Sequence, residues 1–360
     1  MTTELDRTFN AARAAILSPD VTDHIATSAT ELDQGERDTR ENLGLLARSG
    51  LLGLGAPGNH HQALPTMASL ISEVAGHCLS TAFSVWAHRM TLEYLTAAGT
   101  PWSLDAAAGL DGTGPLGVTG MASAFKDAAG CGSIELVATP AGGGYLVNGA
   151  LRWASNLYVD SVMVTAAQTD SGEKIVVALP LAADGVTIGS HFDLLALGST
   201  ASSSVKLDDV YVGENQILSR DTESFLNGVR PTFLVLQSAM CVGLARRCLD
   251  EVASSLVGVN SAFTAQFDSL TTELADIEAQ VARFAAAVGG PTTPAKHDLL
   301  TQRLAAADVV SAAAALEIRT AGGKGYARRT DASRRFREAA FIPVQSPSEA
   351  QLRWELRTGR

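Results

Sequence analysis

Apolar residues recur at helical spacing in the first and last parts of the chain. The stretches 66–95, 233–256, 270–288 and 297–318 are rich in Ala and Leu and nearly free of helix breakers. The segment 289–294 reads Gly-Gly-Pro-Thr-Thr-Pro, which interrupts the pattern because Gly and Pro end helices. The pattern therefore predicts long helices in both parts of the chain.

The middle of the chain, from about residue 114 to 222, has a different pattern. Val, Ile, Thr and Gly become frequent, and the runs 161–167 and 174–179 are rich in β-branched residues. Clusters of Gly, Asp and Ser at 142–144 and 170–172 are typical of turns between strands. These features predict an all-β region.

The order of these regions, helical then β then helical, sets the expected fold class. It differs from the strand–helix alternation of a doubly wound parallel sheet, and no strand–GxGxxG–helix signature occurs. We expect an α+β fold with an N-terminal α-helical domain at 1–113, a middle β domain at 114–222 and a C-terminal α-helical bundle at 223–360.

Composition restricts the function classes. The 360 residues are 46% hydrophobic and 18% charged, which supports a large buried core and argues against disorder. The formal net charge is −11, so the chain as a whole has no attraction for nucleic acid or an anionic membrane. We therefore expect a small-molecule substrate, with no nucleic-acid partner and no membrane partner.

Two features bear on the compartment. No apolar run approaches the ~18 residues of a transmembrane helix, and the first residues do not resemble a secretory signal. The four cysteines are widely spaced, which is typical of free thiols in a reducing compartment, and no companion residues complete a metal-ligand motif. The expectation is a cytoplasmic protein without a metal site.

The stretch 144–156 carries the most chemistry. Its first half predicts a strand, a tight hairpin turn at Asn148-Gly149 and a second strand. Trp153 and Ser155 are two positions apart, so in a strand they share one face. A flat aromatic ring beside a hydroxyl suits a planar heterocycle with polar edges, such as a flavin. The alternative is an ordinary hairpin with a buried Trp.

Several segments, in this order, resemble the acyl-CoA dehydrogenase superfamily of flavoproteins. They are 41–57, 80–88, 149–156, 197–212, 321–326 and 334–338. The resemblance implies a helical domain, a β-barrel-like domain and a C-terminal four-helix bundle. It further implies a homodimer or homotetramer whose subunits share FAD sites, and an oxidoreductase that passes hydride to flavin N5.

The resemblance also implies site residues. Trp153 would lie on the flavin ring and Ser155 near its N5 edge, while the segment around Met121 and Ser123 would contact the ring through its backbone. Residues implied to lie near the neighbouring subunit's cofactor are Phe263, Gly322 and Gly323.

The expected catalytic carboxylate is missing. Dehydrogenases of this family use a Glu to remove the α-proton of an acyl thioester, and the matching position here is Ser346, or Gln345 if shifted by one. Glu349, three residues on, is a fallback candidate. The second location known in the family matches residues 232–233, which are Thr and Phe.

The part of the site that binds the ADP moiety of FAD also departs from the family. The family supplies an Arg to the FAD pyrophosphate from a turn that here is 260–266, where Phe263 is kept and the Arg is not. The part that holds the flavin ring is better preserved than the part that holds ADP, which fits FMN as well as loosely held FAD.

Three functions stay open. The first is an acyl-CoA dehydrogenase-like flavoenzyme acting on an acyl-CoA or related substrate. The second is a two-component monooxygenase that takes reduced flavin from a separate reductase, with His88 as its proton-shuttling residue because oxygenating relatives place a pocket histidine there. The third is a non-catalytic homologue kept for flavin binding or assembly.

Overall fold

The N-terminal part of the computed structural model, which describes residues 15–359, is helical. It contains α2 (Pro19–Asp33), α3 (Arg40–Arg48), α4 (Leu64–His77), α5 (Leu79–Ala98) and α6 (Pro101–Gly109), with a 3-10 turn η1 (His60–Gln62). The predicted helical stretch 66–95 is two helices, because Cys78 is extended and its sulfur accepts a hydrogen bond from the Thr81 backbone N–H. Every residue from 79 to 95 is buried, so α5 is the central helix of the molecule.

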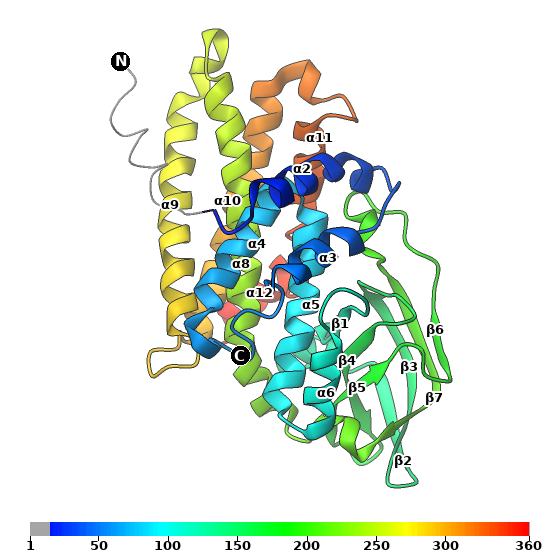
Figure 1. Cartoon of the computed structure of the whole chain (residues 1–360). Helices are drawn as coiled ribbons and strands as arrows, with labels where there is room; N and C mark the ends of the chain where they lie inside the picture. Colours follow the sequence, from blue (N-terminus) through cyan, green and yellow to red (C-terminus); the bar gives the residue numbers. More distant parts are fainter. Residues whose placement is uncertain (1–14, 360) are drawn as a thin grey trace.

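The middle part folds into one mixed sheet beside the helices (Figure 1). Its strands are β1 (Gly117–Gly120), β2 (Leu136–Ala141), β3 (Gly144–Ala154), β4 (Val162–Thr169), β5 (Lys174–Pro180), β6 (Val186–Ile188), β7 (Ser203–Gly213) and β8 (Ile217–Ser219). The strand order is β6-β7-β3-β2-β4-β5-β8, and β1 pairs in parallel with β4. In the described chain no ladder joins β6 to β8, so the sheet is open rather than closed into a barrel.

The all-β expectation for this region is wrong where one α-helix and two short 3-10 turns occur. Helix α7 (Ala122–Ala128) follows β1 directly, and short 3-10 turns η2 (Gly198–Thr200) and η3 (Glu214–Gln216) interrupt the later strands. The α7 segment, Ala-Ser-Ala-Phe-Lys-Asp-Ala, is dominated by residues of adequate helix propensity, so the change is consistent with local sequence.

The hairpin predicted at Asn148-Gly149 is also wrong. β3 continues through both residues, and the turn lies earlier, where Gly142 and Gly143 adopt positive φ between β2 and β3. Asn148 exchanges two side-chain hydrogen bonds with Asp209, which has a positive φ at an irregularity in the β3–β7 ladder. Asn148 therefore lies opposite two β7 residues, 208 and 209, so the extra residue of this β-bulge is on β7.

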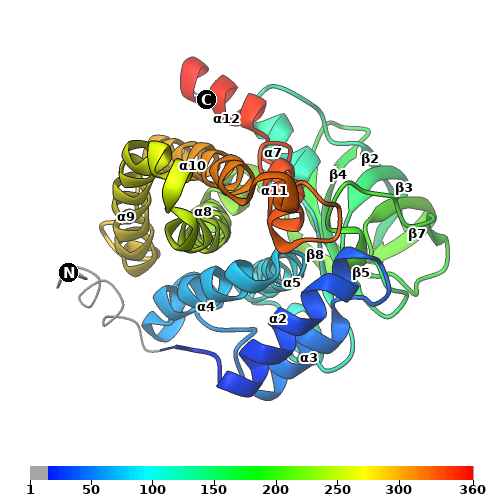
Figure 2. The same ribbon diagram turned by 90° about the horizontal axis from the view of Figure 1, so that it is seen from above.

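The C-terminal part is a helical bundle. It consists of α8 (Thr222–Ser255), α9 (Thr264–Ala287), α10 (Lys296–Gly325), α11 (Asp331–Phe341) and α12 (Glu349–Thr358), with η4 (Gly258–Phe263) between α8 and α9. The view from above shows α8, α9 and α10 side by side, with α4 against α8 and α11 between the bundle and the sheet (Figure 2). α8 and α10 are apolar and long enough to cross a membrane, and most of each apolar window is buried inside the protein.

Apolar side chains form two buried clusters. The larger joins the helices to one side of the sheet, and the smaller consists of strand residues such as Val147, Leu151 and Val205 together with residues of the connecting segments. The α+β class is confirmed by this architecture. The domain boundaries at 113/114 and 222/223 stay predictions.

Candidate functional site

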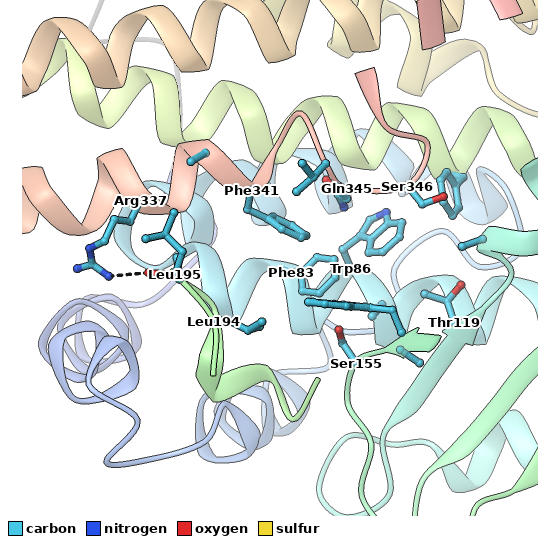
Figure 3. A pocket seen from close by; sticks show the side chains of 18 of the residues that line it. Phe83, Trp86, Thr119, Ser155, Leu194, Leu195, Arg337, Phe341, Gln345 and Ser346 are labelled. Atoms are coloured by element: carbon cyan, nitrogen blue, oxygen red, sulfur yellow. Dashed lines mark hydrogen bonds between the residues drawn. The ribbon is translucent and has the colours of Figure 1, made fainter. Parts of the chain in front are cut away.

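A cavity of about 600 Å³ lies where α5, α8 and α11 meet the end of β3 (Figure 3). It is mainly apolar. The residues that line it are Phe83, Trp86, Ala87, Thr119, Ala122, Lys126, Trp153, Ala154, Ser155, Leu194, Leu195, Ala196, Phe233, Arg337, Ala340, Phe341, Val344, Gln345 and Ser346. A volume of this size admits a ligand of drug or cofactor-ring dimensions.

Aromatic rings form the helical wall of the cavity. Phe83 and Trp86 of α5 are one helical turn apart and stack with ring centroids 5.6 Å apart. Phe341 of α11 meets Phe83 edge-on at 5.0 Å, and Phe233 of α8 meets Trp86 edge-on at 4.9 Å. Figure 3 shows the labelled rings of Phe83, Trp86 and Phe341 gathered above Ser155. Aromatic packing between α5, α8 and α11 therefore fixes the shape of this wall.

Trp153 and Ser155 belong to the sheet wall of the cavity. Both line it, together with Ala154, because the β3–β7 register is irregular between Leu151 and Ala154. The Trp153 side of the wall is open: 51% of that residue is exposed, whereas Ser155 is 5% exposed. Phe192 packs against one part of the Trp153 ring, with centroids 4.6 Å apart. An exposed indole is unusual, since Trp is highly buried on average.

Ser155 is the first member of a chain of buried hydroxyls. Its Oγ lies 2.6 Å from the Oγ of Ser202, which lies 2.8 Å from the Oγ1 of Thr200. Thr200 in turn donates its proton to the backbone carbonyl of Leu197 at 2.7 Å. The residue after Ser155, Asn156, donates from Nδ2 to the carbonyls of Ser84 and Gly117, which ties the sheet wall to α5 and β1.

Gln345 and Ser346 lie on the opposite side, after α11. The fully buried guanidinium of Arg303 donates to the Gln345 side-chain oxygen at 3.3 Å and to the Ile342 carbonyl at 3.2 Å. Gln237 accepts from Arg303 and donates to the Ser346 carbonyl at 2.9 Å. Within residues 15–359, no carboxylate pairs with Arg303, and neither the Gln345 Nε2 nor the Ser346 Oγ has a hydrogen-bond partner.

The charged residues that line the cavity, within the described part of the chain, are Lys126 and Arg337; no Asp or Glu lines it. Arg337 is held by a bidentate pair with Asp33, both contacts at 2.6 Å, and donates to the Leu195 carbonyl at 3.2 Å. Figure 3 shows this last contact at the rim. The cavity therefore offers cations and hydrogen-bond donors, and no carboxylate base.

The nearest carboxylate of α5 is Glu93, and it is fully engaged elsewhere. It pairs with Arg89 at 2.8 Å and accepts from the Gly58 N–H and from the Thr232 hydroxyl. Its location near Thr232 is of interest, because residues 232–233 match the second family position for the base. Phe233 lines the cavity, but Glu93 does not.

His88 is fully buried and is not among the residues lining the cavity. Two residues along a helix correspond to about 200°, so His88 points away from Trp86. Its Nδ1 accepts a hydrogen bond from the Gly117 N–H at 3.1 Å. Burial lowers the pKa of His88 to about 4, with a backbone contact at Leu110 offsetting part of the effect. This placement gives no support to His88 as a proton shuttle in the cavity.

Four further candidate residues, two near the C-terminus and two at α7, differ in placement. Ser346 lines the cavity, whereas Glu349 is the first residue of α12, lies outside the lining and pairs with Arg353 at 2.8 Å. Met121 and Ser123 are buried at the start of α7 and do not line the cavity, although Ala122 does. The structure therefore offers no support for Glu349 as a base acting in this cavity.

Phe263, Gly322 and Gly323 lie at one end of the bundle, away from the cavity lining. The Asn260 side chain donates to the Thr320 carbonyl at 2.9 Å, which joins η4 to the end of α10. The Arg319 guanidinium lies 5.1 Å from the centroid of Phe263. Gly322 and Gly323 are exposed, and Gly322 has a φ of 61°. Their part in a shared cofactor site stays a prediction.

The residues present fit the ring portion of a flavin. A half-exposed indole offers a flat face, and a hydroxyl with free lone pairs stands beside it on the same cavity. The cavity is large enough for the ring and a small substrate group. An arginine in the 260–266 turn, which the family uses for the pyrophosphate, is absent from the sequence.

Comparison with known proteins adds an independent line of evidence. No protein-family model matches the chain. It is 27% identical over 241 residues to the probable acyl-CoA dehydrogenase YngJ of Bacillus subtilis (strain 168), a match that covers 61% of this chain and 62% of that protein. It is 26% identical over 239 residues to benzylmalonyl-CoA dehydrogenase of Aromatoleum aromaticum, covering 63% and 62%. The chain thus spans less than two thirds of the curated relatives it matches.

The fold agrees over nearly the whole chain. The structure of butyryl-CoA dehydrogenase from Megasphaera elsdenii superposes with a TM-score of 0.82 at 17% identity, covering 96% of this chain and 99% of that one. The relatives and structural neighbours of the chain are acyl-CoA dehydrogenases, which supports the superfamily that its sequence resembles. Within this superfamily, dibenzothiophene monooxygenase TdsC from Paenibacillus sp. A11-2 superposes with a TM-score of 0.76 at 17% identity, covering 94% of both chains. A superfamily fold shared by dehydrogenases and a monooxygenase does not choose between the two reactions.

Sequence reasoning missed most of the cavity wall. Phe83 and Trp86 are spaced one helical turn apart, a signal that could have placed them on one face of the helix. Thr200 and Ser202 lie in the segment 199–204, in which every residue except Ala201 carries a hydroxyl, and the approach of this segment to Ser155 depends on the β3–β7 pairing. Arg303 and Gln237 gave no signal, because both lie inside helices predicted only from their apolar spacing.

Proposed function

We propose that this protein is a flavin-dependent oxidoreductase that holds the ring of FAD or FMN against Trp153 and Ser155. The supporting observation is the cavity of about 600 Å³ that presents an exposed indole and a buried hydroxyl on the same wall. When bound, the flavin would accept hydride or react with oxygen. The chain's own part is to bind the ring, to hold a hydrogen bond at Ser155 and to exclude water with the ring cluster of Phe83, Trp86 and Phe341.

We place oxygenation ahead of thioester dehydrogenation. Removing an α-proton needs a base within hydrogen-bond reach, and no carboxylate lines the cavity in the described residues. The rings of the helical wall suit an apolar, aromatic substrate in front of the flavin. In this proposal a separate reductase supplies reduced flavin. FMN fits this proposal as well as FAD, and TdsC has been solved with FMN bound.

The competing candidate is acyl-CoA dehydrogenation. It is favoured by the curated relatives, whose names include acyl-CoA dehydrogenases. The chain would have to use a base other than Glu349, because that carboxylate lies outside the cavity and pairs with Arg353.

Flavin binding is the first test. Purified protein is titrated with FAD and FMN, each in the oxidised and the reduced form, and binding is followed by the change in flavin absorbance or fluorescence. Saturable binding that is weakened by Trp153→Ala supports the proposal. Failure of both flavins to bind in either form would overturn it and leave the non-catalytic homologue as the answer.

The second test separates the two reactions. In one arm, the flavin-loaded protein is mixed without oxygen with butyryl-CoA, and bleaching of the flavin is recorded. In the other, reduced flavin, protein, labelled oxygen and an aromatic heterocycle such as indole or dibenzothiophene are combined. Incorporation of label without bleaching by the thioester supports oxygenation, and bleaching alone would contradict it.

A further inference from the structure

The hydroxyl chain behind Ser155 has only one arrangement of protons that satisfies all its contacts. A hydroxyl carries one proton and can donate one hydrogen bond. The carbonyl of Leu197 can only accept, so the proton of Thr200 must point to it at 2.7 Å. The reverse orientation would set two lone-pair oxygens against each other at that distance.

The remaining directions follow in sequence. Since the proton of Thr200 is committed to Leu197, the 2.8 Å contact with Ser202 requires Ser202 to donate to Thr200. The proton of Ser202 is then committed, so the 2.6 Å contact requires Ser155 to donate to Ser202. Ser155 has no proton left, and its free lone pairs are its only means of bonding a ligand.

All three hydroxyls are buried, which fixes this direction. Thr200 is fully buried, and Ser202 and Ser155 are 3% and 5% exposed. A buried hydroxyl that breaks its hydrogen bond leaves a polar group unpaired, which costs about 1–3 kcal/mol. Water does not supply a substitute partner as it would at the surface. Ser155 is therefore held as an acceptor toward the cavity that it lines.

We infer that the chain Thr200–Ser202–Ser155 makes the site prefer the reduced flavin, by holding Ser155 as an acceptor for the N5–H that only the reduced ring carries. The inference rests on the proposed function, which puts the N5 edge beside Ser155. N5 of the oxidised ring carries only a lone pair, so it faces the lone pairs of Ser155 without a shared proton. Thr200 and Ser202 are positioning residues, since they act through Ser155.

The preference has an expected size. One hydrogen bond that is made in one redox form and missing in the other contributes a factor of about 10 in affinity. A tenfold tighter binding of the two-electron-reduced flavin raises the midpoint potential of the bound flavin by about 30 mV relative to free flavin. This preference suits a protein that receives reduced flavin from a separate reductase.

The test compares the dissociation constants of oxidised and reduced FMN, measured without oxygen, together with the midpoint potential of bound FMN. The wild-type protein should bind the reduced form about tenfold more tightly. In Thr200→Val, Ser202 loses its acceptor and turns its proton to Ser155, which then donates toward the cavity. The preference should move to the oxidised form, and the potential should fall below that of the wild type.

Ser202→Ala gives a second route to the same change, because Ser155 loses its acceptor and is free to donate to the flavin. Ser199→Ala is the matched control: Ser199 is a neighbouring buried serine outside the hydroxyl chain and should leave the ratio unchanged. Equal affinity for both forms in the wild type, or an unchanged ratio in both variants, would overturn the inference while the proposed function stands. Absence of binding in both forms would overturn the two together.

Discussion

The sheet wall and the helical wall of the cavity differ in how their polar groups are satisfied. On the sheet wall, every member of the Ser155–Ser202–Thr200 chain is hydrogen-bonded and the chain ends on a backbone carbonyl. On the helical wall, Gln345 and Ser346 each keep a buried polar atom without a partner in the described residues, and the buried Arg303 behind them meets only neutral groups.

This difference separates cofactor binding from reaction chemistry. A fully satisfied network holds one conformation and suits a contact that must be repeated at every turnover. The unsatisfied groups lie at the positions where the resemblance places the family's catalytic carboxylate, and the side-chain oxygen of Gln345 accepts a hydrogen bond from Arg303. The difference between the two walls supports the proposal that the sheet wall binds a flavin ring, and it gives the helical wall no base for thioester chemistry.

Restoring a carboxylate on the helical wall should give the largest effect. In Ser346→Glu, the new side chain stands on the cavity lining, where it can act as a base toward a bound thioester. General-base catalysis contributes roughly 10²–10⁴-fold, so flavin bleaching by butyryl-CoA should rise by at least about 10²-fold over the wild type. The measurement is absorbance after anaerobic mixing.

Ser346→Gln is the control for this change, because it has the same size as Glu and no basic carboxylate. If the Glu variant binds flavin and stays as inert toward the thioester as the Gln variant, the helical wall is not the place where the base is missing.

Removing the ring from the sheet wall should give the next largest effect. Trp153→Ala takes away an aromatic face worth about 2–3 kcal/mol, which corresponds to roughly 30–150-fold weaker flavin binding. Phe341→Ala on the helical wall should change flavin affinity by less than about threefold, because that ring faces the substrate space. Fluorescence titration measures both. Comparable losses of flavin affinity in the two variants would contradict the proposal that the sheet wall binds the flavin and the helical wall faces the substrate.

The next prediction compares the two faces of α5. His88 lies on the face that points away from the cavity. Its folded pKa of about 4 lies below the ordinary value of 6.5, so the unfolded chain binds the proton more readily between these values. The neutral His88 therefore contributes fully to the free energy of unfolding above pH 6.5. This contribution decreases as the pH falls, by about 2 kcal/mol at pH 5.

His88→Gln keeps an acceptor for the Gly117 N–H and cannot become charged. Urea unfolding at pH 7 and pH 5 should therefore show a loss in the wild type that is about 2 kcal/mol larger than the loss in the variant. Equal pH dependence would mean that His88 titrates as a solvated histidine. A change in flavin affinity in this variant would instead bring His88 back as a site residue.

The sequence predicted best those features that depend only on residues close together in the chain. The long helices, the strands at 162–169 and 174–180 and the free cysteines all match expectation. The hairpin predicted at Asn148-Gly149 is wrong because these residues continue β3 opposite a bulge of β7, and only the pairing of the two strands shows this. His88 does not line the cavity, and the resemblance could not show this because it gave the helix and not the direction of the side chain around it.

The sequence by itself determined the α+β order and the indole–hydroxyl pair at Trp153 and Ser155, since these follow from residue identity and local periodicity. Its resemblance to the acyl-CoA dehydrogenase superfamily implied the missing carboxylate near position 346. Only the tertiary structure decided that Trp153 and Ser155 share one cavity with Phe83, Trp86 and Phe341, and that Thr200 and Ser202 fix the proton of Ser155. The physical reason is that a hydrogen-bond direction and a cavity wall depend on atoms far apart in the chain, which no local pattern can place.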